Sequence, residues 1–142
     1  MSAQFPIAPA AEAVRFAGYA AIFGVPDASG DILHPSAFAA SLAQRRSPLP
    51  LLWEHRPRMQ VGVVDMATED AKGLRVLATV ALPDSRPARL LREGALTGLS
   101  FGYRARQYRT TARGRDLFAV DLFEISLVAN PLQHGARIHL IA

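Results

Sequence analysis

The segment GLSFGYRARQYRTTARGRDLFAVDLFEISLV, residues 98–128, decides the fold of this chain. Its first part, 98–109, alternates apolar and polar residues in a β-prone composition, and its last part, 117–128, is strongly apolar and β-branched. Alternation with a period of two is typical of strands, and Arg113-Gly114 between the two parts has the chemistry of a turn. The segment therefore predicts two strands joined by a turn.

The rest of the chain adds shorter elements on both sides of this pair. Strands are predicted at residues 14–22, 49–53, 61–66, 73–82 and within 137–142, with 54–60 as the connection between the second and the third. Helices are predicted at 35–44, which begins at Pro35, and at 85–93, where Asp84 or Ser85 is the N-cap and Gly94 the end. Many strands with two short helices predict the α+β class, as a mostly antiparallel β-barrel that is closed or nearly closed.

The composition is that of one globular domain. A chain of 142 residues with 50% hydrophobic and 20% charged residues suits a single core. Residues 1–13, rich in Ala and Pro, are predicted to be a flexible leader before a domain at 14–142. The absence of cysteine excludes disulfides, thiolate nucleophiles and Cys-ligated zinc. Without a secretory signal pattern or an apolar run of about 18 residues, we expect a soluble protein that does not enter membranes.

Basic charge is the other feature of the composition. The formal net charge is +4, and nearly all of the positive charge is arginine, with a modest cluster at residues 104–115. Such a surface could meet nucleic acid or an acidic protein. The simpler interpretation is a solvated pair of strands with charged edges, which keep the sheet from aggregating.

Three segments carry side chains suited to catalysis. His55 follows the apolar run 49–53, Ser100 lies between Gly98 and Gly102, and Glu124 lies in the apolar strand 117–128. Flanking glycines allow another backbone to approach a serine closely. A carboxylate on a half-buried strand needs a partner, because an unpaired buried charge costs several kcal/mol.

Each segment also has an ordinary interpretation: a histidine beside a turn, a strand entry with small residues, and an exposed strand face. In a strict period of two, Leu122, Glu124 and Ser126 share one face and the residues between them share the other. Together the segments supply a nucleophile, a base and an orienting carboxylate. Their spacing along the sequence does not show that they meet.

Four blocks in this order resemble the prohead serine protease family of tailed phages and gene transfer agents. The blocks are GYAAIFGVPDASGDILHPSAF at 18–38, LLWEH at 51–55, GALTGLSFGY at 94–103 and DLFEISLVANP at 121–131, and the resemblance spans residues 18–138. It implies a herpesvirus-protease-like barrel, with His55 as the base and Ser100 as the nucleophile. The third member falls on Glu124, with Asp121 as the alternative. An oxyanion-hole amide is expected in the loop 129–135.

The resemblance also implies a biological role. Such a protease would cut scaffold protein or the N-terminal segment of the major capsid protein inside immature capsids, in the cytoplasm of a bacterial host. It would need no cofactor or metal, and the herpesvirus relatives imply a homodimer. The histidines of this chain show no paired spacing of the kind that metal ligands have, and His34 is interpreted as a turn residue.

Other functions remain as alternatives. One is an inactive capsid-assembly component with the same fold, and another is a basic β-barrel that binds nucleic acid, with Tyr103, Tyr108 and nearby arginines as a stacking platform. Gly98-x-Ser100-x-Gly102 also matches the nucleophile elbow of α/β-hydrolases. That assignment fails on context, because an elbow needs a strand before the serine and a helix after it, and this sequence predicts the reverse order.

Overall fold

The computed structural model describes residues 13–142, in which it places eight strands and two short helices. The elements in chain order are β1 (Val14–Ile22), β2 (Ile32–Leu33), α1 (Ala39–Gln44), β3 (Pro50–Trp53), β4 (Arg56–Glu69), β5 (Gly73–Val80), α2 (Arg86–Arg92), β6 (Gly98–Thr110), β7 (Arg115–Val128) and β8 (Ile138–Ile141). Residues 1–12 of the predicted leader lie outside the described part. Neither helix is long or apolar enough to span a membrane.

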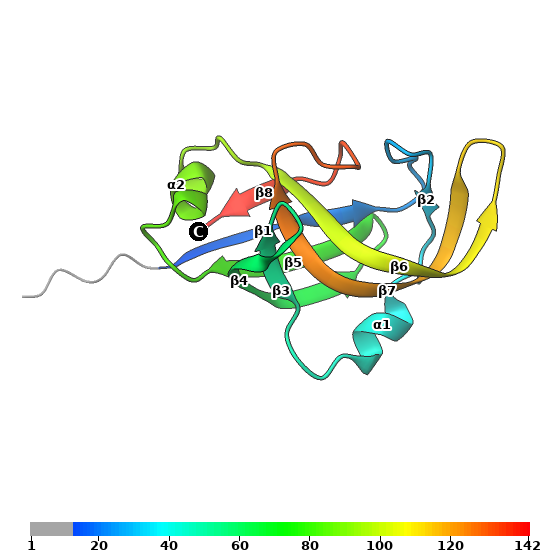
Figure 1. Cartoon of the computed structure of the whole chain (residues 1–142), viewed down its shortest axis with the longest axis horizontal. Coiled ribbons are helices and arrows are strands. Elements are labelled where there is room, and N and C mark those ends of the chain that lie inside the picture. Colours follow the sequence, from blue (N-terminus) through cyan, green and yellow to red (C-terminus); the bar gives the residue numbers. More distant parts are fainter. Residues whose placement is uncertain (1–12) are drawn as a thin grey trace, which may run out of the picture.

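The strands form one strongly curved sheet around a single core (Figure 1). Its order is β2-β7-β3-β4-β5-β1-β8, and β6 pairs with β7 over its whole length. Pairing is antiparallel except that β2 and β3 both run parallel to β7. The predicted α+β class with mostly antiparallel strands is confirmed.

The sheet comes close to a barrel but does not close. The chain just before β8 meets the start of β6 at one bridge, between Gly98 and Arg137. Two backbone hydrogen bonds flank it: Leu99 N–H donates to Ala136 at 3.0 Å, and Ile138 N–H donates to Thr97 at 2.8 Å. No continuous ladder joins the two strands among the described residues. Of the two predicted forms, the closed barrel is therefore wrong, and the nearly closed barrel is the one observed.

The two helices differ in how well the sequence predicted them. Ser85 caps α2, its hydroxyl accepting the Ala88 N–H at 3.4 Å, and Gly94 follows with φ +71, as predicted. In contrast, α1 begins at Ala39 and not at Pro35. Ser36 has φ 74, which no right-handed helix accommodates, and its N–H donates to the Glu69 carboxylate at 2.9 Å.

A β-bulge in β7 decides which of its side chains face outward. Gly102 of β6 pairs with Glu124, but the next residue, Tyr103, pairs with Leu122, which leaves Phe123 as the extra residue. The strict alternation predicted for this strand is therefore wrong at one point. Leu122 turns into the core, and Phe123 is 51% exposed.

Beyond the bulge the alternation resumes. Ile125 and Leu127 are fully buried in the core, and Glu124 and Ser126 lie together on the opposite face, where their side chains are hydrogen-bonded. On the paired strand β6, Leu99 and Phe101 belong to the same core. The bulge thus presents Glu124 on the outside of the barrel without removing apolar side chains from the inside.

Candidate active site

The turn between β3 and β4 carries His55. The sequence predicted a connection at 54–60, but the turn consists of Glu54 and His55 alone, and β4 already begins at Arg56. Both turn residues have positive φ, 49 and 59, as in the type I′ turns that favour Asn and Gly. A residue with a Cβ in this region costs about 1–3 kcal/mol, and such strain persists where surrounding contacts fix the backbone.

Contacts with β7 hold this turn in place (Figure 1). Because β3 pairs in parallel with β7, Glu54 N–H donates to the Leu127 carbonyl at 3.0 Å. His55 N–H donates to Ser126 Oγ at 3.0 Å, and the Glu54 carboxylate accepts the Ala129 N–H at 2.7 Å. Two hydrogen bonds from the backbone of the turn and one to the Glu54 side chain therefore hold the turn that carries the imidazole.

The imidazole of His55 is bound directly to Glu124. Its Nδ1 lies 2.6 Å from Glu124 Oε2, a short contact typical of a charge-assisted hydrogen bond. The Glu124 side chain is only 11% exposed, and the His55 side chain is 42% exposed. The hydrogen bond to Glu124 raises the pKa of His55 above its usual value, partly offset by burial, and the charges of Glu124 and Glu54 raise it further.

Ser100 lies on β6 directly opposite Ser126 of β7, and Gly102 lies opposite Glu124. Side chains that are directly opposite in an antiparallel pair share a face, with Cβ atoms about 4.5–5.5 Å apart. The fold therefore brings Ser100 to the face that carries Glu124 and the β3–β4 turn. No hydrogen bond joins Ser100 to His55 in residues 13–142, and catalytic contacts are often loose in unbound enzymes.

Glycine at position 102 makes room for the carboxylate. A Cβ built on Gly102 would lie 2.4 Å from Glu124 Oε2 and 2.8 Å from its Cδ. At Gly98 the corresponding Cβ would lie 2.4 Å from the Val128 carbonyl oxygen. Both glycines thus allow a close approach, as their positions beside the serine suggested, but the group that approaches is part of this chain.

The alternative carboxylate, Asp121, does not reach His55. Its Oδ2 accepts hydrogen bonds from Arg104 at 3.0 Å and Arg106 at 3.1 Å at the exposed edge of the β6–β7 pair. Of the two carboxylates considered for the third member, only Glu124 contacts the imidazole. Of the three residues predicted to act together, His55 and Glu124 are hydrogen-bonded, and the strand register places Ser100 opposite Ser126, beside the Gly102–Glu124 pair.

Ser126 is the site residue whose part the sequence did not reveal. It was placed on the face of Glu124, but a serine in an apolar strand is usually a packing residue, and nothing in the sequence marks it further. The hydroxyl accepts the His55 N–H and donates to Glu124 Oε1 at 2.7 Å. In the loop 129–135, where an oxyanion-hole amide was expected, the N–H of Ala129 already donates to the Glu54 carboxylate.

His34 makes contacts that the sequence did not indicate. Its Nε2 lies 3.0 Å from Asp116 Oδ1, and its ring stacks on Phe118 with centroids 4.8 Å apart, so it is more than a turn residue. Asp116 also accepts a hydrogen bond from Arg109 at 3.2 Å. In the described part of the chain, no group of three or more His, Cys, Asp or Glu side chains could hold a metal ion.

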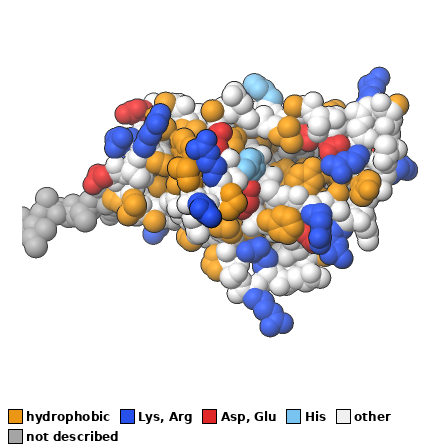
Figure 2. All heavy atoms as spheres, in the orientation of Figure 1, with side chains coloured by type: hydrophobic (Ala, Val, Ile, Leu, Met, Phe, Trp, Pro, Cys, Tyr) orange, Lys and Arg blue, Asp and Glu red, His pale blue; other side chains and the backbone are white. Residues whose placement is uncertain are grey.

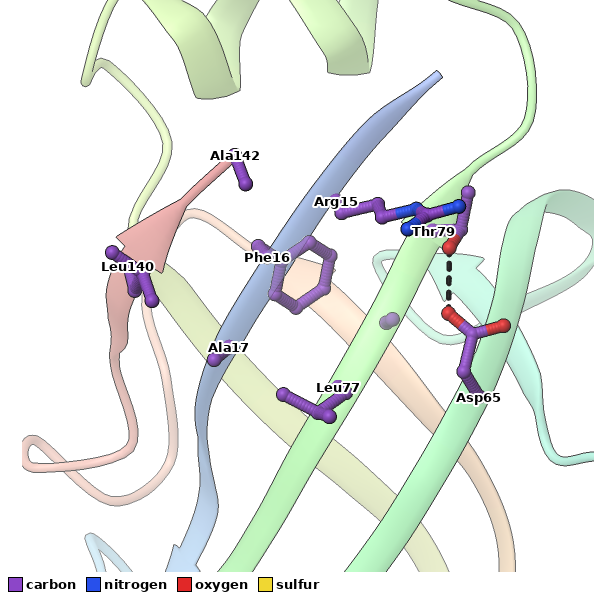
Figure 3. Close-up of a pocket in the computed structure, with 9 residues that line it drawn as sticks. Arg15, Phe16, Ala17, Asp65, Leu77, Thr79, Leu140 and Ala142 are labelled. Atoms are coloured by element: carbon purple, nitrogen blue, oxygen red, sulfur yellow. Dashed lines mark hydrogen bonds between the residues drawn. The ribbon is translucent and has the colours of Figure 1, made fainter. Parts of the chain in front are cut away.

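One apolar pocket lies away from the candidate site. A pocket of about 390 Å³ opens between β1, β5 and β8, lined by Phe16, Leu77 and Leu140, with a Thr79–Asp65 hydrogen bond at its side (Figure 3). None of the three predicted catalytic side chains lines it. Figure 2 shows Lys and Arg side chains spread over the visible face instead of one continuous basic patch.

Comparisons with known proteins agree with this architecture. A family model described as caudovirus prohead serine protease matches residues 4–142. The prohead protease of Enterobacteria phage HK97 is 32% identical over 130 residues, covering 87% of this chain and 58% of the relative. A capsid polyprotein of Pseudomonas phage PAJU2 is 29% identical over 124 residues, covering 80% of this chain and 18% of the relative. The chain thus spans less than two thirds of either relative.

Solved structures confirm the herpesvirus-protease-like fold. The Kaposi's sarcoma-associated herpesvirus protease, in complex with a hexapeptide phosphonate inhibitor, has a TM-score of 0.60 at 15% identity, covering 92% of this chain and 65% of that one. The varicella-zoster virus protease has a TM-score of 0.60 at 20% identity, covering 90% and 64%. With the family model matching nearly all of its length, the chain belongs to the caudovirus prohead serine proteases.

Proposed function

We propose that this chain is a serine endopeptidase of phage capsid maturation, in which Ser100 is the nucleophile, His55 the base and Glu124 the orienting carboxylate. The observation that carries the proposal is the 2.6 Å contact between His55 Nδ1 and Glu124 Oε2, on the face to which β6 brings Ser100. Family membership supports the reaction class.

The proposed mechanism gives each group a step. With Nδ1–H held by Glu124, the neutral imidazole has its lone pair on Nε2, which takes the Ser100 proton as the oxygen attacks the scissile carbonyl. Glu124 stabilises the imidazolium that forms. The imidazolium then gives its proton to the leaving amine, the acyl-enzyme forms, and a water molecule activated by the same imidazole releases the acid.

The expected substrate is a capsid component. The names of the relatives, a prohead protease and a capsid polyprotein, support scaffold protein or the N-terminal segment of the major capsid protein as the target. The site of action would be the immature capsid in the host cell. In the proposed site the His55 side chain is 42% exposed, whereas Ser100 and Glu124 are largely buried.

Co-expression with the capsid protein of the same phage or element tests the proposal. Mass spectrometry of the capsid protein should show a trimmed N-terminus with the unmodified protease and an intact one with Ser100→Ala or His55→Ala. His34→Ala is the matched control, because it removes a histidine that also contacts a carboxylate, at the other end of β7. Normal trimming by Ser100→Ala would refute the assignment.

A reactive probe tests the nucleophile without a natural substrate. The Ser100 oxygen should attack the phosphorus of a fluorophosphonate and displace fluoride into solvent while its proton passes to His55. The product is a phosphonylated serine that peptide mapping can locate. Labelling of another serine, with Ser100 unmodified, would contradict the proposed nucleophile.

The homodimer implied by the family's relationship to herpesvirus proteases is tested by measuring specific activity over a series of protein concentrations. A specific activity that does not change with concentration would exclude activation by dimerisation.

A further inference from the structure

Ser126 lies at the centre of the candidate site without access to solvent. It pairs with Leu52 of β3 on one side and with Ser100 of β6 on the other, and its exposed fraction is 0%. A fully buried hydroxyl cannot attack a peptide bond of another protein. Ser126 is therefore not a second candidate for the nucleophile, and its polar group needs another explanation.

The hydrogen bonds of Ser126 join the two halves of the His55–Glu124 pair. The hydroxyl accepts the backbone N–H of His55 at 3.0 Å and donates its own proton to Glu124 Oε1 at 2.7 Å. A hydroxyl has one donor and two acceptor positions. One small side chain thus fixes the backbone that carries the base and one oxygen of the carboxylate that orients it.

The second oxygen of Glu124 then has a defined direction. With Oε1 held by Ser126, the carboxylate cannot rotate about its terminal bond without losing that hydrogen bond, and Oε2 remains aimed at His55 Nδ1. The carboxylate χ angle is otherwise broad and roughly two-fold, so an unrestrained Glu would sample several orientations. The turn formed by Glu54 and His55, where both residues have positive φ, also needs contacts from outside the turn to hold its backbone.

We propose that Ser126 is a positioning residue, which holds the Glu124 carboxylate and the His55 turn in register so that the imidazole is presented to Ser100. This inference rests on the proposed protease function and extends it to a residue that touches no substrate. Its effect is expected in kcat and not in KM, because it acts on the groups that move the proton.

A merely structural role would give a different result. Ser41 provides the comparison: its hydroxyl accepts the Leu122 N–H at 2.9 Å, so it also binds β7, two residues before Glu124 but with no hydrogen bond to that carboxylate among the described residues. Ser41→Ala and Ser126→Ala both remove a serine hydroxyl that accepts a backbone N–H. Only the second also releases the Glu124 carboxylate.

The experiment measures both chemistry and the state of the histidine. We expect Ser126→Ala to lower kcat by about ten- to a hundredfold relative to Ser41→Ala, with KM little changed, since a misplaced catalytic group costs about that much. NMR titration of the His55 ring should show its pKa falling toward about 6.5, because a freely rotating carboxylate hydrogen-bonds the ring less well. The low-field resonance of the Nδ1 proton should broaden or disappear.

The titration needs no protease activity, so it separates the two proposals. If the unmodified protein cleaves nothing but Ser126→Ala lowers the His55 pKa, the proposed function fails and the positioning role stands. If Ser126→Ala matches Ser41→Ala in His55 pKa and in kcat, the positioning role is refuted. Should the alanine variant not fold, Ser126→Cys keeps nearly the same size with a weak hydrogen-bonding group, and an unchanged His55 pKa in that variant would refute the role equally.

Discussion

Replacing Gly102 with alanine should impair the candidate site while leaving the fold intact. The new Cβ would lie 2.4 Å from Glu124 Oε2, whereas ordinary contacts begin near 3.4 Å, so the carboxylate oxygen must move by about 1 Å. That oxygen is the one bound to His55 Nδ1 at 2.6 Å. A displacement of about 1 Å in a catalytic group costs about a hundredfold in rate.

The fold should survive, because the three closest atoms all belong to the Glu124 side chain and not to the backbone, and Gly102 has no left-handed φ. Some stability should be lost, because the displaced carboxylate weakens its hydrogen bonds to Ser126 and His55. The assay is kcat/KM on a capsid-derived peptide, with thermal unfolding measured on the same sample. Gly62→Ala is the contrasting variant: its Cβ would lie 1.9 Å from the backbone oxygen of Thr79, so it should destabilise the fold. A Gly102→Ala protein with unchanged kcat/KM would refute the reasoning.

Four further predictions concern charge. Glu124→Gln should lower kcat by about 10³–10⁴-fold, and a mispositioned imidazole should account for the residual activity. Asp121→Asn should leave kcat unchanged. The reverse pattern would show that the third member of the triad is misassigned. Because Glu124 raises the pKa of His55, kcat/KM should rise with pH through a midpoint above about 6.5. The stabilisation from the pair should be complete below about 6.5 and be lost as pH rises through the folded-state pKa, which denaturant melts at several pH values would detect. Asp31 accepts a hydrogen bond from Arg115 Nη2 at 2.8 Å, and this partner lowers the pKa of the carboxyl. Asp31→Asn should therefore lower the free energy of unfolding by about 2 kcal/mol at pH 7. The difference between the two proteins should shrink as pH falls below about 4.

The sequence predicted those parts of the structure that local chemistry determines. β1 has the predicted bounds, and α2 has Ser85 at its N-cap and Gly94 beyond its end, because alternation, capping and turn residues act over a few positions. Glu124 was identifiable for a related reason. A carboxylate among apolar neighbours in a strand requires a partner if the strand buries it, and the family resemblance placed the third member at this position.

Features set by contacts distant in sequence were not predictable in this way. Glu-His is an unusual pair for a two-residue turn, and Arg56-Pro57 after it suggested a longer connection, yet bonds from β7 hold the turn. The bulge at Phe123 leaves no signature of its own, since an extra apolar residue in an apolar strand looks like continued alternation. The role of Ser126 depends on both features together.

The parallel pairing of β3 with β7 also sets when the site can form during synthesis. The His55 amide waits for an acceptor 71 residues further along the chain, and until that residue has left the ribosome the base has no fixed position. Contacts of such high contact order form slowly, since the intervening chain must first be ordered. A polypeptide that ends between Ser100 and Ser126 would therefore carry the proposed nucleophile before the proposed base has its backbone acceptor.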